Sequence, residues 1–336
     1  MGRVSTEPAP TPARSAGAAT VLARSRGELA VALADAPDPR AVVMTMGALH
    51  EGHFDLVREA ARRVGPAGTV VVTIFVNPLQ FAPTEDLDSY PRDLEGDLAG
   101  LTRTLTGVDG ALGVGRLVVF APTPEVIYPA GQPSVCIDPG PIATVLEGRT
   151  RPTHFAGVCQ VVLTLMHLTA PRWALFGRKD AQQLAIIESM VRDLAVPLEI
   201  VPVDIRRESD GLAMSSRNAY LSPEQRRQAL ALSRALQAGR DAAAQAAGSG
   251  TRLDPAAIRR AALASLEAAD GVEIDYVALV DPAGFEDLTD AGLGLPRRAP
   301  VHEDAGEGLP AVGLLAVAAR VGTTRLIDNT LIGLHP

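Results

Sequence analysis

Two histidines stand three residues apart in the stretch MTMGALHEGH, which spans residues 44–53. His50 and His53 make up a third of the six histidines in the chain. Paired imidazoles can ligate a metal ion or bind an anion. The zinc-protease motif H-E-x-x-H needs histidines four residues apart on one helix face, whereas His50 and His53 are only three residues apart, with Gly52 between them. No third ligand follows at a suitable spacing, so the sequence disfavours a zinc site.

An anion site fits the same stretch better. The histidines follow an apolar run and open a helical pattern, and the first turn of a helix offers free backbone N–H groups and a positive dipole end. Gly47 lets the backbone approach a ligand closely, and Gly52 allows a tight entry into the helix. The alternative is that both histidines only cap a surface turn. We favour a phosphate site because the pair and the glycines occur together.

A second anion-binding candidate is MSSR at residues 214–217, which follows the polar segment RRESDGLA at residues 206–213. Two hydroxyls and a guanidinium suit phosphate oxygens, although Ser-Ser-Arg is also ordinary loop composition. The chain contains neither a glycine-rich Walker loop nor a G-x-G-x-x-G dinucleotide fingerprint.

The elements that must position these residues alternate along the chain. Apolar runs at 41–46, 70–76, 117–120, 173–176 and 198–205 predict buried strands, and helical spacing is found at 52–63, 94–105, 158–168 and 180–194. This alternation predicts an α/β fold, a Rossmann-like doubly wound parallel sheet covered on both faces. Ligands bind beyond the carboxyl ends of such strands. His50 and His53, then Asn77 and Gln80, then Lys179 and Asp180 all follow strands there.

The pattern changes after residue 205. A polar loop leads into Ala- and Arg-rich helices broken at 248–250, and the stretches 273–280 and 311–328 resemble strands. We therefore predict a disordered tail at 1–20, a Rossmann-like phosphate-binding domain at 21–205, and a smaller α+β domain at 206–336. Exposed loops are predicted at 106–115, which has the character of an insertion, and at 303–308.

Composition limits the class of protein. The formal net charge of −8 argues against nucleic acid as the main partner, because such affinity comes largely from phosphate neutralisation. No apolar run reaches the roughly 18 residues of a membrane span, and the N-terminus lacks a signal-peptide core, although Gly2 and Thr6 fit a loose myristoylation pattern. Cys136 and Cys159 lack metal-ligand spacing and indicate a reducing cytoplasm. Lys179 is the only lysine in the chain.

Six motifs together resemble the pantoate–β-alanine ligase family of the nucleotidyltransferase superfamily. They run in family order from about residue 22 to the C-terminus. The motifs are TMGALHEGH (45–53), FVNPLQF (75–81), YPR (90–92), LEGRTRP (146–152) with His154 and Phe155, FGRKD (176–180) with Gln182 and Gln183, and DGLAMSSRN (210–218).

The resemblance implies a reaction in two steps. The carboxylate of (R)-pantoate attacks the α-phosphate of Mg-ATP, which gives pantoyl adenylate and pyrophosphate. The amine of β-alanine then attacks the acyl carbon, which gives pantothenate and AMP. The resemblance also implies Mg²⁺ as cofactor and a cytoplasmic homodimer that acts on small molecules, without nucleic acid or membrane partners. With it, the domain at 21–205 is predicted to bind nucleotide and pantoate, and the domain at 206–336 to act as a lid whose loop 206–217 orders on ATP.

The resemblance also implies roles for residues at matching positions. His50, His53, Lys179 and Arg217 are the implied catalytic residues, with His53 as the proton donor. Gln80 and Gln183 match glutamines that bind pantoate in the substrate site, where β-alanine also binds. Asp97 matches an aspartate of the magnesium site. The implied ATP-binding residues are Met46, Gly47, His50, His53, Gly177, Lys179, Asp180, Arg206, Met214, Ser215, Ser216 and Arg217.

The chain departs from the family pattern at a few positions. Met44 replaces a frequent proline, Arg178 replaces a glutamate, and Gly96 replaces an acidic neighbour of Asp97, which weakens the magnesium assignment. Arg206 stands where a small apolar residue usually contacts adenine. Two alternatives remain open: another adenylate-forming nucleotidyltransferase and a catalytically inactive nucleotide-binding regulator. A role in charging tRNA is disfavoured by the acidic net charge.

Overall fold

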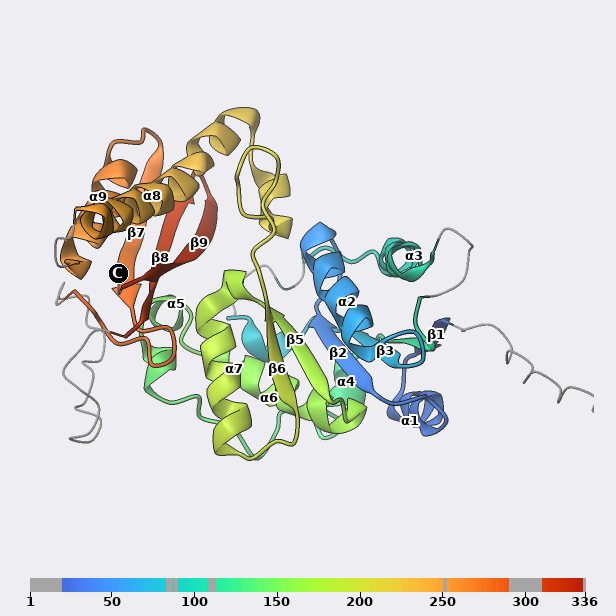
Figure 1. Cartoon of the computed structure of the whole chain (residues 1–336). Coiled ribbons are helices and arrows are strands. Elements are labelled where there is room, and N and C mark those ends of the chain that lie inside the picture. The colour runs from blue at the N-terminus through green and yellow to red at the C-terminus, as the bar shows by residue number, and fades with distance from the viewer. Residues whose placement is uncertain are drawn as a thin grey trace, which may run out of the picture.

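The computed structural model describes residues 20–82, 87, 90–107, 113–249, 253–289 and 310–334 (Figure 1). Most of the predicted N-terminal tail, the centre of the predicted insertion at 106–115, and the predicted loop at 303–308 lie outside the described residues. Within the described chain, two units are arranged side by side, one around a large sheet and one around a small sheet.

The larger unit is built on a six-stranded parallel sheet with the order β1-β4-β3-β2-β5-β6. The predicted α/β doubly wound fold is therefore confirmed, and each predicted strand matches an observed one to within two residues at each end. The short edge strand β1 was not predicted. The strands are β1 (Thr20–Ala23), β2 (Arg40–Thr45), β3 (Thr69–Ile74), β4 (Arg116–Phe120), β5 (Trp173–Gly177) and β6 (Glu199–Val203).

Helices cover both faces of this sheet, which is why its central strands carry buried apolar residues on both sides. The helices are α1 (Arg26–Ala34), α2 (Glu51–Val64), α3 (Leu94–Leu105), α4 (Pro124–Ile127), α5 (Glu147–Thr150), α6 (His154–Thr169) and α7 (Ala181–Asp193). Val42 and Val71 face the core formed with α1, α6 and α7, whereas Val43 and Val72 face the core formed with α2 and α3. Single 3₁₀ turns are η1 (Pro78–Gln80), η2 (Pro141–Thr144), η3 (Arg178–Asp180) and η4 (Ser216–Tyr220).

The smaller unit packs two helices, α8 (Pro223–Gly248) and α9 (Pro255–Glu267), on one face of an antiparallel sheet (Figure 1). The sheet contains β7 (Val272–Val280), β8 (Val312–Val321) and β9 (Thr324–Gly333). The stretch 311–328 was predicted as one strand-like segment, and that is wrong. Gly322 has a φ of +60°, which turns the chain after β8 and starts β9 two residues later.

The strand order reverses between β2 and β5. From β2 the chain proceeds through β3 and β4 towards one edge, and from β5 it proceeds to β6 at the other edge. Loops that leave the two central strands therefore diverge, and the space between them is where α/β sheets bind ligands. The loop after β2 carries the histidine pair, and the turn after β5 carries Lys179.

A partly buried ion pair joins the two units. Arg325 on β9 donates to both carboxylate oxygens of Glu147 on α5, each at 2.7 Å, and also pairs with Asp275 on β7. The Tyr276 hydroxyl donates to the same Glu147 carboxylate at 2.9 Å. We refer to Glu147, Asp275, Tyr276 and Arg325 as the interdomain cluster.

Among the described residues, no helix combines the length and apolar composition needed to cross a bilayer.

Candidate active site

The loop between β2 and α2 is held in place from behind by Asp97. The Asp97 carboxylate accepts hydrogen bonds from the backbone N–H groups of Ala48 at 3.0 Å and Leu49 at 2.7 Å. Gly47 adopts a φ of +88°, and a Cβ atom there would lie 3.1 Å from Asp97 Oδ2. Only glycine adopts this backbone region without cost, so Gly47 and Asp97 together fix the shape of the loop.

The two histidines stack at the start of α2, with ring centroids 4.1 Å apart. His50 Nδ1 accepts the N–H of Gly52 at 3.2 Å, and His53 Nδ1 accepts the N–H of His50 at 3.3 Å. Because Nδ1 is an acceptor in both rings, we assign the proton of each neutral imidazole to Nε2. A side chain at Gly52 would lie 3.0 Å from the His50 ring, which explains the glycine between the histidines.

Both histidines are neutral in this environment. Burial and the neighbouring His50 lower the pKa of His53 to about 3, and burial together with Lys179 lowers the pKa of His50. An imidazolium is therefore not populated at neutral pH in the protein without nucleotide. His53, which the family resemblance implies as a proton donor, is set up to donate a hydrogen bond through Nε2 rather than to act as a strong acid.

The η3 turn at the end of β5 presents Lys179. Its side chain is 20% exposed, and Nζ lies 3.7 Å from Asp180 Oδ1. Burial would raise the pKa of Asp180, but the cations Lys179 and Arg217 outweigh burial and hold that pKa below its usual value. A Cβ atom at Gly177 would meet nothing within 4 Å, so this glycine leaves open space at the strand end.

The loop 206–217 is a short hairpin. Arg207 pairs with Ala213 in an antiparallel bridge, and the N–H groups of Glu208 and Met214 bond across the hairpin to Leu212 and Arg206. The Met214 sulfur accepts a hydrogen bond from the Gly52 N–H at 3.3 Å, which joins this hairpin to the first turn of α2. The Arg206 guanidinium pairs with Asp55 on α2 at 3.2 Å. Arg206 would have to leave this pair to contact a nucleotide through its charge.

These three segments line one cavity of about 270 Å³. Apart from Gly47 and Asp97, every predicted site residue lines it: Met46, His50, His53, Gln80, Gly177, Lys179, Asp180, Gln183, Arg206, Met214, Ser215, Ser216 and Arg217. A second cavity of about 530 Å³ extends from there to the C-terminal sheet. The two cavities share Arg151, His154, Lys179, Asp180, Gln183, Ser215 and Arg217 on their walls.

The structure separates the two neighbouring glutamines of α7. Gln182 is buried and holds the backbone of Glu147, Ile142 and Val145 through its amide group. Gln183 lines both cavities, whereas Gln182 lines only the larger one. Gln183, which was predicted to bind substrate, therefore borders the smaller cavity together with the other predicted site residues.

Gln80 is held by residues that the sequence analysis did not include among the site residues. Arg151 donates to the Gln80 carbonyl at 3.2 Å, and His154 Nδ1 lies 3.1 Å from the same oxygen. Asn77 donates to the Gln80 side-chain oxygen at 3.3 Å and accepts from the Tyr128 hydroxyl at 2.9 Å. Arg151, His154 and Asn77 lie inside or beside the motifs that carry the resemblance, so that signal was available; no motif marked Tyr128.

The donor set does not fit a metal ion held by the protein alone. Within the described part of the chain, no group of three or more His, Cys, Asp and Glu side chains is arranged to bind a metal. Asp97 is only 4% exposed and already accepts two backbone N–H groups, so its carboxylate is committed to the loop. Magnesium is commonly carried by substrate phosphates with few protein ligands.

Comparisons with known proteins agree with one another. The sequence profile of the family described as pantoate-beta-alanine ligase matches residues 23–331. A pantothenate synthetase of Nocardioides sp. is 49% identical over 93% of this chain and 85% of its own length. Pantothenate synthetase 4 of Frankia alni is 53% identical over 86% of this chain and 82% of its own length.

Solved structures give the same result. The crystal structure of pantothenate synthetase from Thermus thermophilus matches with a TM-score of 0.76 and 40% identity, over 94% of this chain and all of that one. A pantoate-beta-alanine ligase from Francisella tularensis, complexed with beta-gamma ATP and beta-alanine, matches with a TM-score of 0.66 and 27% identity. It covers 93% of this chain and 98% of its own.

Proposed function

The chain belongs to the pantoate–β-alanine ligase family, and from this premise we propose that it condenses pantoate with β-alanine, with ATP converted to AMP and pyrophosphate. One observation carries the proposal: the three polar segments at the switch point of the sheet line a single cavity together with Gln80 and Gln183. Cationic and hydroxyl groups suit the phosphates of ATP, and neutral amides suit the hydroxyls and carboxylate of pantoate.

The first step that we propose is adenylation. A carboxylate oxygen of pantoate attacks the α-phosphorus of ATP, a new P–O bond forms, and the bond to pyrophosphate breaks. Negative charge grows on the α-phosphate oxygens and on the leaving pyrophosphate. The two neutral Nε2–H donors of His50 and His53 and the ammonium of Lys179 stabilise this charge, and Ser215, Ser216 and Arg217 bind the outer phosphates. Catalysis of this kind is mainly orientation and charge stabilisation.

The second step is aminolysis. The free amine of β-alanine attacks the acyl carbon of pantoyl adenylate, the amide bond forms, the bond to the AMP oxygen breaks, and the nitrogen releases one proton to solvent as AMP leaves as an anion. The larger cavity shares a wall with the smaller one, so it offers β-alanine a route to the acyl carbon while pantoyl adenylate occupies the smaller cavity.

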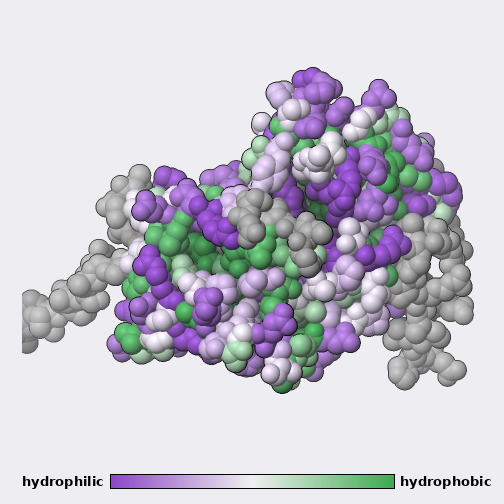
Figure 2. Space-filling model, turned by 180° about the vertical axis from the view of Figure 1, so that it is seen from behind, coloured by the Kyte–Doolittle hydropathy of each residue, from purple (hydrophilic) through white to green (hydrophobic). Residues whose placement is uncertain are grey.

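Further parts of the proposal concern the cofactor, the assembly and the compartment. We propose that magnesium arrives with ATP on its phosphates. Figure 2 shows apolar residues gathered on the back of the larger unit, a surface of the kind that marks interfaces, which supports a homodimer. Both cysteines are free, with Cys136 exposed and Cys159 buried, which agrees with a reducing cytoplasm.

The decisive experiment mixes the protein with Mg-ATP, pantoate and β-alanine and measures AMP and pantothenate by mass spectrometry. We expect AMP formation to require all three substrates in steady state. With oxygen-18 in the pantoate carboxylate, we expect label in AMP. Turnover without label in AMP would exclude the adenylate, turnover with another acid in place of pantoate would indicate a different acyl-adenylating enzyme, and ATP binding without turnover would indicate an inactive regulator.

A further inference from the structure

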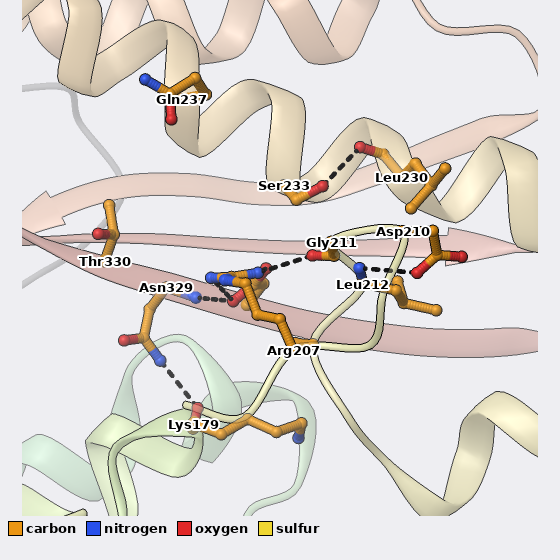
Figure 3. A network of polar contacts seen from close by, with 12 residues as sticks. Lys179, Arg207, Asp210, Gly211, Leu212, Leu230, Ser233, Gln237, Asn329 and Thr330 are labelled. Carbon is orange, nitrogen blue, oxygen red and sulfur yellow. Dashed lines mark hydrogen bonds and ion pairs between the residues drawn. The ribbon is translucent and has the colours of Figure 1, made fainter. Parts of the chain in front are cut away.

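Two neighbouring residues of β9, Asp328 and Asn329, reach from the C-terminal sheet to the hairpin at 206–217 and to the η3 turn, respectively. Figure 3 shows Asn329 between Thr330 and Lys179. Both side chains belong to the smaller unit, and they are 3% and 6% exposed, respectively. The Asn329 backbone N–H donates to the Asp328 carboxylate at 2.8 Å, so the two residues form one rigid unit. We refer to Asp328 and Asn329 as the β9 pair.

Asn329 holds the turn that presents Lys179. Its side-chain amide donates to the carbonyl of Arg178 at 3.0 Å and to the carbonyl of Lys179 at 2.8 Å. The turn is a 3₁₀ segment of only three residues and has no side-chain cap. Two hydrogen bonds from one amide therefore fix the backbone from which the Lys179 side chain extends, as the dashed line to Lys179 in Figure 3 indicates.

Asp328 holds the hairpin that carries Ser215, Ser216 and Arg217. Its two oxygens accept from Arg207 Nη1 at 2.7 Å and Nη2 at 3.0 Å, a two-point ion pair. The same Arg207 guanidinium donates to the Gly211 carbonyl at 3.1 Å and so closes the tip of the hairpin. Paired, planar contacts of this kind specify orientation as well as contributing energy.

We propose that the β9 pair is a positioning device that sets the separation between the Lys179 turn and the hairpin that carries Ser215–Arg217. The inference rests on the proposed function, because it assumes that ATP phosphates bind between these two segments. One strand holds both segments through consecutive residues, so any displacement of β9 moves both walls of the cavity. The smaller unit thereby acts on the phosphates without contacting them.

The first test compares Asn329→Ala and Asn329→Asp with Thr330→Ala. Thr330 is the next residue on β9, and its hydroxyl contacts Arg240 and the Leu331 carbonyl rather than either phosphate-binding segment. Asn329→Asp keeps the shape of the side chain but replaces the amide donor with an acceptor that faces two carbonyl oxygens. Affinities for ATP and for AMP are measured by calorimetry, and thermal melting confirms that each variant folds.

We expect both Asn329 variants to bind ATP at least about tenfold more weakly, the effect of one or two lost hydrogen bonds. Binding of AMP, which lacks the outer phosphates, should change by less than about twofold, and Thr330→Ala should match the wild type for both nucleotides. Equal losses for ATP and AMP, or unchanged ATP affinity in folded Asn329→Ala, would overturn the positioning role.

A double-mutant cycle tests whether Asn329 acts through Lys179. In a Lys179→Ala background the ammonium is gone, so Asn329→Ala should change ATP affinity by less than about twofold further. Losses that multiply would show that Asn329 contributes independently of Lys179 and would overturn the coupling.

Asp328→Asn addresses the other half of the pair. We expect faster hydrogen exchange at 206–214 with unchanged exchange in α8, and unchanged exchange at 206–214 would overturn this part of the inference.

Failure of the proposed function is recognised separately, because a wild-type protein that binds ATP but forms no AMP from pantoate and β-alanine fails that proposal alone. A wild-type protein that does not bind ATP fails both.

Discussion

Replacing Gly47 with alanine tests how the loop between β2 and α2 is held in its conformation. Its φ is +88°, and a Cβ atom there would lie 3.1 Å from both Asp97 Oδ2 and Ile74 Cγ2. Gly131 provides a matched control, because its φ is +80° and a Cβ atom there would meet nothing within 4 Å. Gly47→Ala and Gly131→Ala therefore share the backbone cost and differ in the contact.

The two costs can be estimated separately. An L-residue held at positive φ costs about 1–2 kcal/mol, and Gly131→Ala carries this term alone. In Gly47→Ala the Asp97 carboxylate must also shift, which weakens its bonds to the N–H groups of Ala48 and Leu49. Hydrogen bonds to charged groups contribute about 1.5–3 kcal/mol each, so partial weakening of both adds about 1–2 kcal/mol. We expect Gly47→Ala to lose about 2–4 kcal/mol of unfolding free energy in total.

Urea unfolding of both variants measures these free energies, and the rate of AMP formation measures the effect on the site. We expect kcat/KM to fall at least about tenfold in Gly47→Ala, because the loop carries Met46 and His50 and small misplacements of catalytic groups are costly. Gly131→Ala should retain the wild-type rate. Equal destabilisation of the two variants together with unchanged activity in both would refute the argument that Asp97 shapes the loop.

Three further predictions concern charge. Lys179→Arg should keep the wild-type melting temperature yet lose at least about 2–3 kcal/mol of transition-state stabilisation, since a wide planar guanidinium replaces a compact ammonium group. A kcat/KM within about threefold of wild type would contradict this prediction. The unfolded chain protonates His53 near pH 6.5 but the folded protein only near pH 3, so the stability from neutral His53 is complete above pH 6.5 and declines as pH falls towards 3. Urea unfolding at pH 7 and 5 should show wild type losing up to about 2 kcal/mol more than His53→Gln, and equal losses would show no such linkage. Glu147→Gln should lower the unfolding free energy by about 2–3 kcal/mol, because Arg325 is left with Asp275 as its only carboxylate partner in a partly buried site; a change below about 0.5 kcal/mol in urea would show that the interdomain cluster is not a stabilising contact.

The sheet was predictable because its strands are buried on both faces. Runs such as residues 70–76 are apolar at nearly every position, which a one-sided strand or an amphipathic helix does not show. Strand β1 was missed because four residues carry too little pattern. Helix α1 was missed although Ser25 and Glu28 form a capping box, a signal present in the sequence. The hairpin of β8 and β9 was read as a single segment because its turn is only two residues long.

The sequence predicted those candidate site residues that come directly after the carboxyl end of a strand of the parallel sheet. Three separate segments were predicted to meet, and the structure brings them to one cavity. The supporting residues were not predictable in the same way. Asn329 acts on backbone carbonyls of a distant turn, and Tyr128 acts on Asn77 from another loop. Neither residue type nor local spacing in one sequence encodes such contacts, because they depend on how two units pack.

The contacts between the two units have a consequence for the order of folding. Asn329 and Lys179 are 150 residues apart in the chain, Arg207 and Asp328 are 121 apart, and Glu147 and Arg325 are 178 apart. Contacts this distant in sequence require large loop closures and form late. Each sheet and its helices can form from nearer neighbours, and β9 then docks against the η3 turn. We therefore expect ATP binding to return during refolding only after secondary structure has formed and the two units have joined, which stopped-flow circular dichroism and nucleotide binding would measure together.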